Sequence, residues 1–320
     1  MSIPSEVNEF REYFYSLVEQ IPEGKVTTYG DLARALGDIR ASRAVGKMLN
    51  ENPRAPEVPC HRVVMSDGKI GGFKGGIENK IEILNSEGVG VENNRIVDFE
   101  DILFNDFESE KILNKLRENQ MEVKENVKIE DDFEDIDIVG GVDVSYTKDR
   151  GYAALSVWEG NKELDRFIID KEISFPYIPT YLSFREMPIL LDLLDEAEIE
   201  PDVILVDGNG ILHPRGIGLA SHFGVEGDIP TIGVAKSQLI GDKEKEVMHE
   251  NPLSKIKYDS ELLGYAFLSS ERAKNPIYIS PGHRVSHETS FNIVKMYCQY
   301  KIPDPIRKAH ITATQRRKRE

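Results

Sequence analysis

The sequence predicts two domains of different class, a small and mostly α-helical domain with a helix-turn-helix, followed by a larger α/β domain. Two short amphipathic segments between residues 28 and 52 indicate the first domain, and β-branched, strand-like runs between residues 138 and 206 indicate the second. The chain has 320 residues, of which 40% are hydrophobic. It is therefore longer than one core usually organises, and it has enough apolar residues for two cores.

The two helices of the first domain have their own start and stop signals. Thr28 followed by Asp31 is a capping-box pattern that opens a short helix, and Gly37 is placed to close it. A second helix is predicted to start near Ser42 and to end before Pro53. Its apolar face consists of Ala44, Val45, Met48 and Leu49.

Two short helices around a tight turn predict a helix-turn-helix, in which the first residues of the second helix meet nucleic acid. Arg43 occupies that position. Taken alone, Arg43 fits a solvated helix charge equally well.

The run VPCHRVV, residues 58–64, contains one of the two cysteines of the chain. A thiol titrates near pH ~8.5 when unperturbed, so a nucleophilic cysteine needs a base or a positive field to raise its thiolate fraction. His61 follows Cys60 and could take its proton. Adjacent side chains usually diverge, however, so these residues alone leave a buried structural cysteine as the alternative.

The motifs around Cys60 make a specific series. In order, they are GKVTTYGDLARALG (24–37), SRAVGKMLNENP (42–53), PCHRVV (59–64), GGFKGG (71–76), Lys80 and SEG (86–88). Together they resemble the catalytic domain of O6-alkylguanine-DNA alkyltransferases over residues 5–96. The resemblance implies a winged-helix-like domain at residues 1–96 that needs no cofactor.

The same resemblance implies a role for each residue of the reaction. Cys60 would take an alkyl group from guanine O6 and keep it, Glu87 would orient His61, and His61 would draw the thiol proton through a water. A guanine O6 inside a duplex is out of reach of a buried thiol, so the nucleotide has to be flipped out.

DNA-contacting roles also follow from the resemblance. Arg43 would enter the stack in place of the extruded nucleotide, Tyr29 would rotate the flanking phosphate, and Asn52 would hold the turn beneath the active-site loop. Arg62 is placed among the DNA-binding residues as well. Phe73 stands where many family members have a tyrosine, which removes a hydroxyl donor to the substrate. Without the context, Tyr29 fits a half-buried packing residue.

In the second half, acids lie within or directly after predicted strands. Asp143 lies inside the apolar run IVGGVDVSY (138–146), and Asp207 follows four apolar residues in PDVILVDGNG (201–210). A buried acid is costly without a partner. Glu186 stands near the start of a predicted helix, and three carboxylates brought together by a sheet and a helix suit Mg²⁺. Each acid alone fits a cap or a surface charge.

Six motifs extend this pattern and resemble those of endonuclease V, the deoxyinosine 3′-endonuclease, over residues 105–310. They are GVDVSY, PYIPTYLSFRE, DVILVDGNG, HPRGIGLASHFG, TIGVAKS and ISPGHRVS. The resemblance implies a ribonuclease-H-like domain with a mixed central sheet. It further implies that Asp143, Glu186 and Asp207 bind Mg²⁺, with Mn²⁺ as a substitute, and that His283 assists at the scissile phosphate. The product would be a nick at the second phosphodiester 3′ to hypoxanthine.

Lesion recognition by this second domain is implied in the same way. Pro176 to Pro179 would form a wedge, with Tyr177 stacking into the gap left by the lesion, and Lys236 would face the phosphate backbone. The residues expected to line the base pocket are Gly208, Gly210 and His213.

The remaining cysteine and the histidines suggest no further chemistry. Cys298 shares helical spacing with Phe291 and Val294, which favours a core role. The histidines that could form a zinc site lie too far apart for a compact ligand pattern; they are His213, His222 and His283.

The charge distribution marks a domain boundary. Of the net charge of -16, residues 97–137 contribute -10, with 5 Lys and Arg against 15 Asp and Glu. We therefore predict a short linker at residues 97–106 between domains 1–96 and 107–320, the second beginning with a helix near residue 112. The run RRKR, residues 316–319, predicts a basic tail or a plain solvated terminus.

The sequence thus predicts a bifunctional DNA-repair protein acting on damaged double-stranded DNA that contains O6-alkylguanine or deoxyinosine. Two distant cysteines and the lack of a signal peptide or membrane-length apolar run indicate a reducing cytosol and no membrane partner. Two alternatives remain. One is a sensor that binds alkylguanine without repairing it and directs the nuclease to DNA. The other is a nuclease acting mainly on inosine in RNA.

Overall fold

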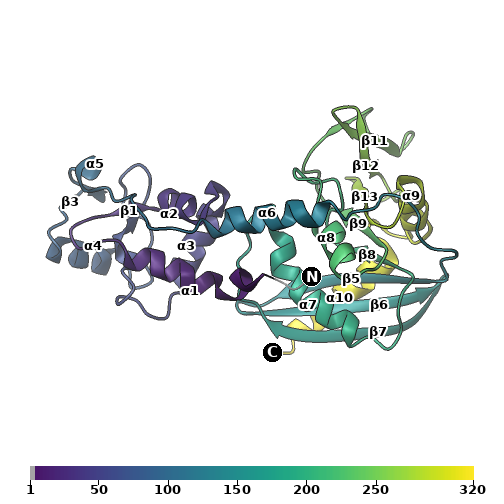
Figure 1. The fold of residues 1–320 in the computed structure, drawn as a ribbon, viewed down its shortest axis with the longest axis horizontal. Coiled ribbons are helices and arrows are strands. Elements are labelled where there is room, and N and C mark those ends of the chain that lie inside the picture. Colours follow the sequence, from purple (N-terminus) through teal and green to yellow (C-terminus); the bar gives the residue numbers. More distant parts are fainter. Residues whose placement is uncertain (1–3) are drawn as a thin grey trace. The chain divides into compact units, whose positions relative to one another are not determined.

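The protein, a computed structural model in which residues 4–320 are described, divides into two compact units (Figure 1). The N-terminal unit comprises Pro4–Glu118 and Ser174–Pro179. The C-terminal unit comprises Asn119–Ile173 and Thr180–Glu320. Helix α6 (Ile112–Lys124) contributes to both units.

Residues 97–106 do not behave as the predicted linker. They include the short helix α5 (Phe99–Ile102), and Val26 exchanges backbone hydrogen bonds with Ile102 and Phe104 at 3.0 and 2.7 Å. Phe99 and Ile102 also pack against the apolar core of the N-terminal unit. Acidic residues predominate around Phe99 and Ile102, so the charge of the segment alone gives no sign of this packing.

The N-terminal unit is mostly helical, as predicted. Its remaining elements are α1 (Ser5–Glu19), β1 (Thr27–Thr28), α2 (Tyr29–Leu36), η1 (Ile39–Ala41), α3 (Ser42–Glu51), η2 (Cys60–Arg62), β2 (Val63–Val64), α4 (Ile77–Ser86), β3 (Val91–Glu92) and β4 (Arg95–Ile96). Strands β1 and β2 pair in parallel, so the residues before α2 lie beside those that follow η2.

The helix-turn-helix has the predicted boundaries. Thr28 caps α2 because its Oγ1 accepts a hydrogen bond from the Asp31 N–H at 3.0 Å. Gly37 ends the helix with a φ of 106°, a left-handed conformation that favours glycine. The predicted apolar face of α3 is buried.

The C-terminal unit is built on one nine-stranded sheet in the order β10-β11-β12-β13-β9-β8-β5-β6-β7. Its strands are β5 (Ile138–Tyr146), β6 (Arg150–Glu159), β7 (Lys162–Glu172), β8 (Val203–Val206), β9 (Thr231–Ala235), β10 (Asp242–Lys243), β11 (Leu253–Tyr258), β12 (Glu261–Phe267) and β13 (Ile277–His283). Only the β5–β8 and β8–β9 pairs are parallel, so the sheet is mixed, as predicted.

Helices cover both faces of this sheet (Figure 1). Helices α7 (Leu182–Asp195) and α8 (Leu219–Glu226) share one apolar cluster with the sheet, while α9 (His287–Met296) and α10 (Asp304–Arg317) pack against the other face. Gly141 allows α10 to approach β5, because a Cβ there would lie 2.3 Å from the Pro305 carbonyl carbon. Side chains alternate along a strand, so Asp143 faces the same side as Gly141, toward α10.

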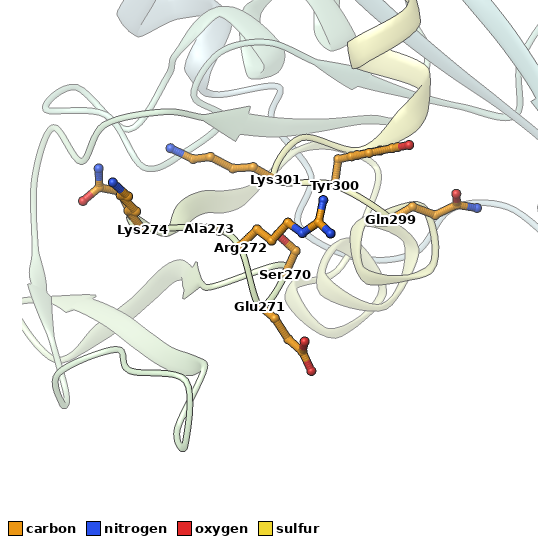
Figure 2. Close-up of a pocket in the computed structure, with 9 residues that line it drawn as sticks. Ser270, Glu271, Arg272, Ala273, Lys274, Gln299, Tyr300 and Lys301 are labelled. Carbon is orange, nitrogen blue, oxygen red and sulfur yellow. The ribbon is translucent and has the colours of Figure 1, made fainter.

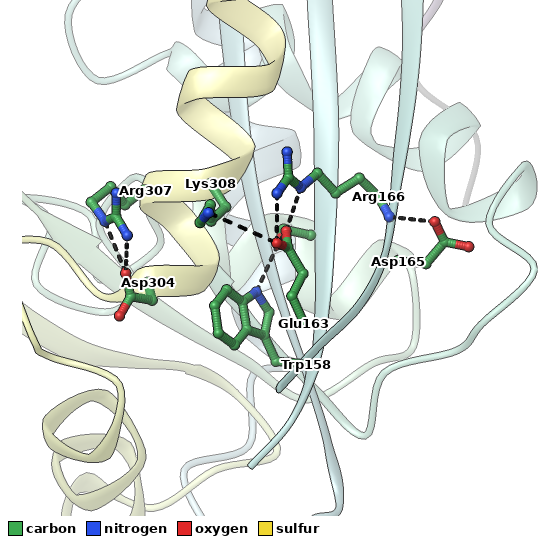
Figure 3. Close-up of polar contacts among 8 residues, drawn as sticks. Trp158, Glu163, Asp165, Arg166, Asp304, Arg307 and Lys308 are labelled. Atoms are coloured by element: carbon green, nitrogen blue, oxygen red, sulfur yellow. Dashed lines mark hydrogen bonds and ion pairs between the residues drawn. The ribbon is translucent and has the colours of Figure 1, made fainter. Parts of the chain in front are cut away.

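Polar contacts fix α10 along the outer strands (Figure 3). Glu163 on β7 forms an ion pair with Arg166, approaches Lys308 of α10 at 4.0 Å, and accepts a hydrogen bond from the Ser156 hydroxyl at 2.9 Å. Farther along the helix, Arg316 pairs with Asp170 at 3.0 Å. The basic run at residues 316–319 is therefore partly helical and paired, and not simply a disordered tail.

No helix within the described residues is long and apolar enough to cross a membrane.

Two candidate active sites

The first candidate site is a small cavity at the Cys60 thiol. The cavity measures about 200 Å³, and its other lining residues are Tyr29, Gly46, Leu49, Asn50, Gly72, Phe73 and Lys74. Asn52 donates a hydrogen bond from Nδ2 to Cys60 Sγ at 3.0 Å, while its Oδ1 accepts from the Arg54 N–H at 2.9 Å. Asn52 therefore ties the turn after α3 to the nucleophile. Burial raises the pKa of Cys60, against the opposing effects of the Asn52 hydrogen bond and the Lys80 charge.

His61, Arg62 and Glu87 form a linked group beside this cysteine. His61 Nε2 lies 2.9 Å from Glu87 Oε1, and Arg62 donates to both Glu87 oxygens at 2.9 and 2.7 Å. Burial would raise the pKa of Glu87, but hydrogen bonds from Arg62 and His61 outweigh it and lower the pKa. Glu87 is thus an ionised acceptor that places the His61 proton on Nε2.

The other ring nitrogen of His61 is left as the base. Nδ1 is buried and has no hydrogen-bond partner among residues 4–320. Burial also lowers the pKa of His61, so the ring is neutral at pH 7. A neutral imidazole with a free lone pair can accept a thiol proton directly or through a water.

Arg62 has a different position from the one predicted. Its guanidinium is occupied by Glu87 and by the Ile21 carbonyl, which accepts from Nη1 at 2.7 Å. The structure therefore gives Arg62 a role in holding Glu87, and its DNA-binding role stays a prediction. The partner of Arg62 lies 25 residues away in sequence, beyond the reach of local pattern.

The other predicted DNA contacts lie as follows. Arg43, the second residue of α3, is exposed, and Tyr29, the first residue of α2, is half-buried in the cavity wall. Phe73 forms another part of the wall, with its ring edge-on to His61 at a centroid distance of 6.3 Å.

Lys80, which belongs to the motif series around Cys60, supports the residues next to the cavity. It is fully buried, and its Nζ donates to the carbonyls of Val63, Ile70 and Gly72 at 2.5, 2.7 and 3.3 Å. Burial lowers its pKa to about 7. Lys80 thereby links the strand after Cys60 to the loop that forms the opposite wall.

The second candidate site is a group of three carboxylates in the C-terminal unit. Asp143 lies on β5 and Asp207 follows β8, and the register Val142–Val206 places them side by side. Burial, a hydrogen bond with Asp207 and nearby carboxylates raise the pKa of Asp143. Glu186, buried on α7, has its pKa raised to about 7 by burial, with the Asp207 charge adding to the effect. The structure thus brings the three predicted acids within electrostatic reach of one another.

Two further side chains complete the cluster. Lys236, predicted to face the phosphate backbone, instead forms an ion pair with Asp207. The Tyr146 hydroxyl donates to Glu186 Oε1 at 2.8 Å, and the Arg185 guanidinium lies 4.3 Å from the Tyr146 ring centroid. Lys236 therefore partly neutralises acids that would otherwise repel one another.

The chemistry of the donors fits a hard divalent cation. Within residues 4–320, no three His, Cys, Asp or Glu side chains are arranged closely enough to hold a metal ion as they stand. The acids nevertheless present only oxygen atoms, and the raised pKa values of Asp143 and Glu186 indicate that more positive charge would stabilise their ionised forms. Asp143, Glu186 and Asp207 would hold such an ion once Lys236 releases Asp207.

The histidine at the carboxylates is His310, and the assignment of His283 is corrected. His310 Nδ1 on α10 lies 3.0 Å from Asp143 Oδ2. His283 pairs with Thr231 at the start of β9, whereas Lys236 follows the end of β9, about 17 Å farther along the strand. His283 Nδ1 accepts a hydrogen bond from the Lys128 N–H at 3.3 Å.

A weak sequence signal for His310 did exist. It lies four residues after Ile306 and next to Ala309, on a helix whose apolar residues are buried against the sheet. A histidine bordering the buried face of a terminal helix has many structural explanations, however, and only the packing of α10 on β5 distinguishes among them.

The predicted wedge and base pocket have mixed outcomes. Tyr177 is 58% exposed between the buried residues Pro176 and Ile178, as an aromatic offered to a ligand would be. Gly210 has a packing role, because a Cβ there would lie 1.9 Å from the Pro281 carbonyl oxygen. His213 Nδ1 accepts from the Arg215 N–H at 3.2 Å. A base-binding role for Gly208, Gly210 and His213 stays a prediction.

Comparison with known proteins relates each half of the chain to a known family. A family model described as Endonuclease V matches residues 121–311, and one described as 6-O-methylguanine DNA methyltransferase, DNA binding domain, matches residues 9–89. A bifunctional methyltransferase/endonuclease from Picrophilus torridus is 40% identical over 298 residues, covering 93% of each chain. The chain belongs to this bifunctional methyltransferase/endonuclease family. A protein of the same description from Thermoplasma volcanium is 35% identical over 97% of this chain and 91% of its own.

Solved endonuclease V structures confirm the ribonuclease-H-like mixed sheet. The catalytic domain of human endonuclease V matches with a TM-score of 0.60 and 32% identity, covering 66% of this chain and 97% of that one. Ciona intestinalis endonuclease V, solved with DNA containing an inosine followed by a ribo-adenosine, matches with a TM-score of 0.60 and 31% identity, covering 66% and 99%. Together the comparisons support DNA repair with alkyltransferase and endonuclease activities.

The second cysteine of this chain has no comparable setting. Cys298 lies just beyond the end of α9, so it is not within the helix as predicted, and it packs half-buried against the sheet core. Burial raises its pKa to about 12, which keeps the thiol protonated.

The C-terminal unit also has a basic cavity of about 510 Å³ (Figure 2). Its walls are the β12–β13 loop, residues 270–275, and the residues between α9 and α10, 299–301. Figure 2 shows Arg272 directed toward Tyr300 and Glu271 pointing away. Among residues 4–320, Arg272, Lys274 and Lys301 find no ion-pair partner for their side chains. Unpaired cations in a hollow suit an anion.

Proposed function

We propose that the protein is a bifunctional DNA-repair enzyme. Residues 1–96 would transfer the alkyl group of O6-alkylguanine in DNA to Cys60 in a single turnover. Residues 107–320 would nick DNA at the second phosphodiester 3′ to deoxyinosine in a hydrolysis that uses Mg²⁺, with Mn²⁺ as a substitute. The observation that carries this proposal is that each unit holds its own reactive group with partners, a thiol beside a neutral histidine and a buried carboxylate cluster.

In the alkyl transfer, His61 Nδ1 takes the thiol proton and Sγ attacks the alkyl carbon. The carbon–O6 bond breaks as the sulfur–carbon bond forms, and the departing guanine anion takes up the proton that His61 removed from the thiol, which returns His61 to its neutral form. Asn52 donates a hydrogen bond to Sγ, which stabilises the thiolate. A thioether has no easy route back to a thiolate, so the protein acts once.

The rate of alkyl transfer should fall at acid pH. Burial holds the pKa of His61 below its usual value, so its base form persists at pH 7 and is lost as the pH drops through that lowered pKa. We expect the single-turnover rate with free O6-alkylguanine base to be constant near pH 7 and to decline only on the acid side of the usual histidine range. The free base avoids the pH dependence of DNA binding. A rate that stays constant throughout the acid range in which the protein remains folded would exclude His61 as the base.

In the nuclease, side chains around the carboxylate cluster bind and orient the phosphate and move protons. Bound Mg²⁺ would supply charge for the pentacovalent phosphate and lower the pKa of a water. Tyr146 fixes Glu186 through its hydroxyl, and Lys236, once free of Asp207, can pair with a phosphate oxygen. His310 is placed beside Asp143 to transfer a proton at the scissile group.

Comparison of the two histidines tests that assignment. His310→Ala should slow nicking of inosine DNA by about 10² to 10⁴-fold, the usual range for a general acid or base, with binding affinity retained. His283→Ala is the matched control and should nick at nearly the wild-type rate, because His283 is remote from the carboxylates. Single-turnover nicking in Mg²⁺ measures both. The reverse ranking would restore His283 as the functional histidine.

The basic cavity is proposed to contact a phosphate of the DNA away from the lesion. Removing one such contact should weaken binding of inosine DNA and reduce the slope of log Kd against log salt by about 1. We expect this of Arg272→Ala and Lys301→Ala, measured by fluorescence anisotropy across salt concentrations. Lys162→Ala, an exposed lysine on the outer strand β7, is the control. An unchanged slope in both cavity variants would remove the cavity from the DNA-binding surface.

The proposed function is tested with the whole chain and matched oligonucleotides. Duplexes that carry one O6-methylguanine, one deoxyinosine or neither are incubated with and without Mg²⁺. We expect an alkylated protein by mass spectrometry with the first, independent of Mg²⁺, and a nick with the second only in Mg²⁺. Binding of alkylguanine without a mass shift would indicate the sensor alternative, and faster nicking of inosine RNA would indicate the RNA nuclease.

A further inference from the structure

The turn from α3 to Cys60 is organised by the buried residue Asn52, which ends that helix. Asn52 Nδ2 donates to Cys60 Sγ at 3.0 Å, and Asn52 Oδ1 accepts from the Arg54 N–H at 2.9 Å. The Arg54 carbonyl accepts from the N–H of Val58, two residues before Cys60, at 3.0 Å. The backbone of Arg54 is therefore bonded to both halves of the turn.

The hydrogen bond from Arg54 decides which end of the Asn52 amide faces the sulfur. An asparagine amide has a donor nitrogen and an acceptor oxygen of nearly the same size, and rotation by half a turn exchanges their places. Only the oxygen can accept from the Arg54 N–H, so this bond leaves the nitrogen to face Cys60 Sγ. A donor at this place stabilises a thiolate, whereas an oxygen would destabilise it.

The side chain of Arg54 is held by α1, within the same N-terminal unit. Its guanidinium lies over the Tyr15 ring, 5.2 Å from the centroid, and it pairs with Glu12 at 3.0 Å and with Glu19 at 3.9 Å. Tyr15 is itself fixed, because it is 3% exposed and its hydroxyl donates to the Met48 carbonyl of α3 at 3.2 Å. One aromatic side chain of α1 thus contacts α3 before the turn and Arg54 within the turn.

We propose that Arg54 is a positioning residue for the Cys60 nucleophile and acts through Asn52. The contacts of its side chain with α1 keep its backbone N–H against Asn52 Oδ1, and Nδ2 is thereby kept on the sulfur. Arg54 is not among the residues that line the cavity, so it acts without touching the substrate. This inference rests on the proposed alkyl transfer to Cys60.

The test uses the full chain with Cys298→Ala, so that Cys60 is the only thiol. Arg54→Ala keeps the backbone N–H but removes the contacts with α1. We expect alkyl transfer from free O6-alkylguanine base to slow roughly three- to tenfold, a part of the effect of losing one hydrogen bond to a charged group. The pH midpoint for the reaction of Cys60 with iodoacetamide should rise by up to about one pH unit, because the Asn52 hydrogen bond lowers the pKa of the thiol.

Arg95→Ala is the matched control for both measurements. Arg95 is another exposed arginine of the N-terminal unit that pairs with a carboxylate, that of Asp67 at 3.5 Å, and it lies on β4. Its removal should change neither the transfer rate nor the iodoacetamide midpoint. An unchanged rate and midpoint in Arg54→Ala, or equal changes in Arg95→Ala, would overturn the proposal.

A double-mutant cycle with Asn52→Ala separates positioning from a general loss of structure. Asn52→Ala removes the donor to the sulfur, so adding Arg54→Ala to it should slow the transfer no further. Equal slowing by Arg54→Ala with and without Asn52 would overturn the proposal, because Arg54 would then act independently of Asn52. If Asn52→Ala does not fold, Asn52→Asp takes its place, since aspartate keeps the acceptor for the Arg54 N–H and lacks a donor for the sulfur.

Failure of the proposed function gives a different result from failure of this inference. If Cys60 were not the alkyl acceptor, the wild type would gain no alkyl group on this residue. The iodoacetamide midpoints do not depend on alkyl transfer, so they would still report whether Arg54 acts on Cys60 through Asn52.

Discussion

Cys60→Ala is expected to abolish alkyl transfer completely while nicking of inosine DNA continues at the wild-type rate. The thiol is the only atom at the first site that can hold the alkyl group, and metal-assisted hydrolysis at the second site needs no thiol. The wild-type protein should gain one alkyl group per chain and then stop. Intact-protein mass spectrometry after incubation with O6-methylguanine DNA measures both results.

Cys298→Ala provides the matched control for this prediction. Burial raises the pKa of Cys298 to about 12, so its thiol should neither accept the alkyl group nor affect the transfer rate. A mass shift that survives in Cys60→Ala but disappears in Cys298→Ala would reverse the assignment. More than one turnover by the wild type would reject stoichiometric transfer altogether.

Asp207→Asn is expected to eliminate nicking and leave affinity for inosine DNA intact. The substitution keeps the size of the side chain but removes a charged metal ligand. Such a ligand stabilises the transition state by several kcal/mol, so the nicking rate should fall roughly a thousandfold or more. Asp143→Asn should behave alike. Tyr177 is untouched, so binding measured by anisotropy should match that of the wild type.

Thermal unfolding provides a check on this variant. Asp207 and Asp143 repel each other when both are ionised, so Asn at position 207 should leave the melting temperature of the metal-free protein unchanged or raise it. Loss of nicking with a retained melting temperature then reports chemistry and not unfolding. Asp242→Asn, at an exposed position on β10, should nick normally. Wild-type nicking by Asp207→Asn in Mg²⁺ would show that the carboxylates are structural.

The sequence by itself determined the features whose signals lie within a few residues. The capping pair Thr28 and Asp31 and the terminal Gly37 set the boundaries of α2, and the apolar, β-branched run 138–146 became β5 over the same residues. Asp207 directly follows β8 (Val203–Val206), because four consecutive apolar residues are most stable in a buried strand. Capping, periodicity and strand burial are local free energies, so a local pattern is sufficient to predict them.

The tertiary structure alone decided which distant groups meet. His310 contacts Asp143, 167 residues away in sequence. Arg62 pairs with Glu87, and Lys236 pairs with Asp207, which lies 29 residues before it. The membership of Ser174–Pro179 in the N-terminal unit likewise depends on the burial of Phe175 against Phe10. Such pairings are fixed by the packing of whole helices and strands, whose contact free energies are spread over many residues and leave no local mark in the sequence.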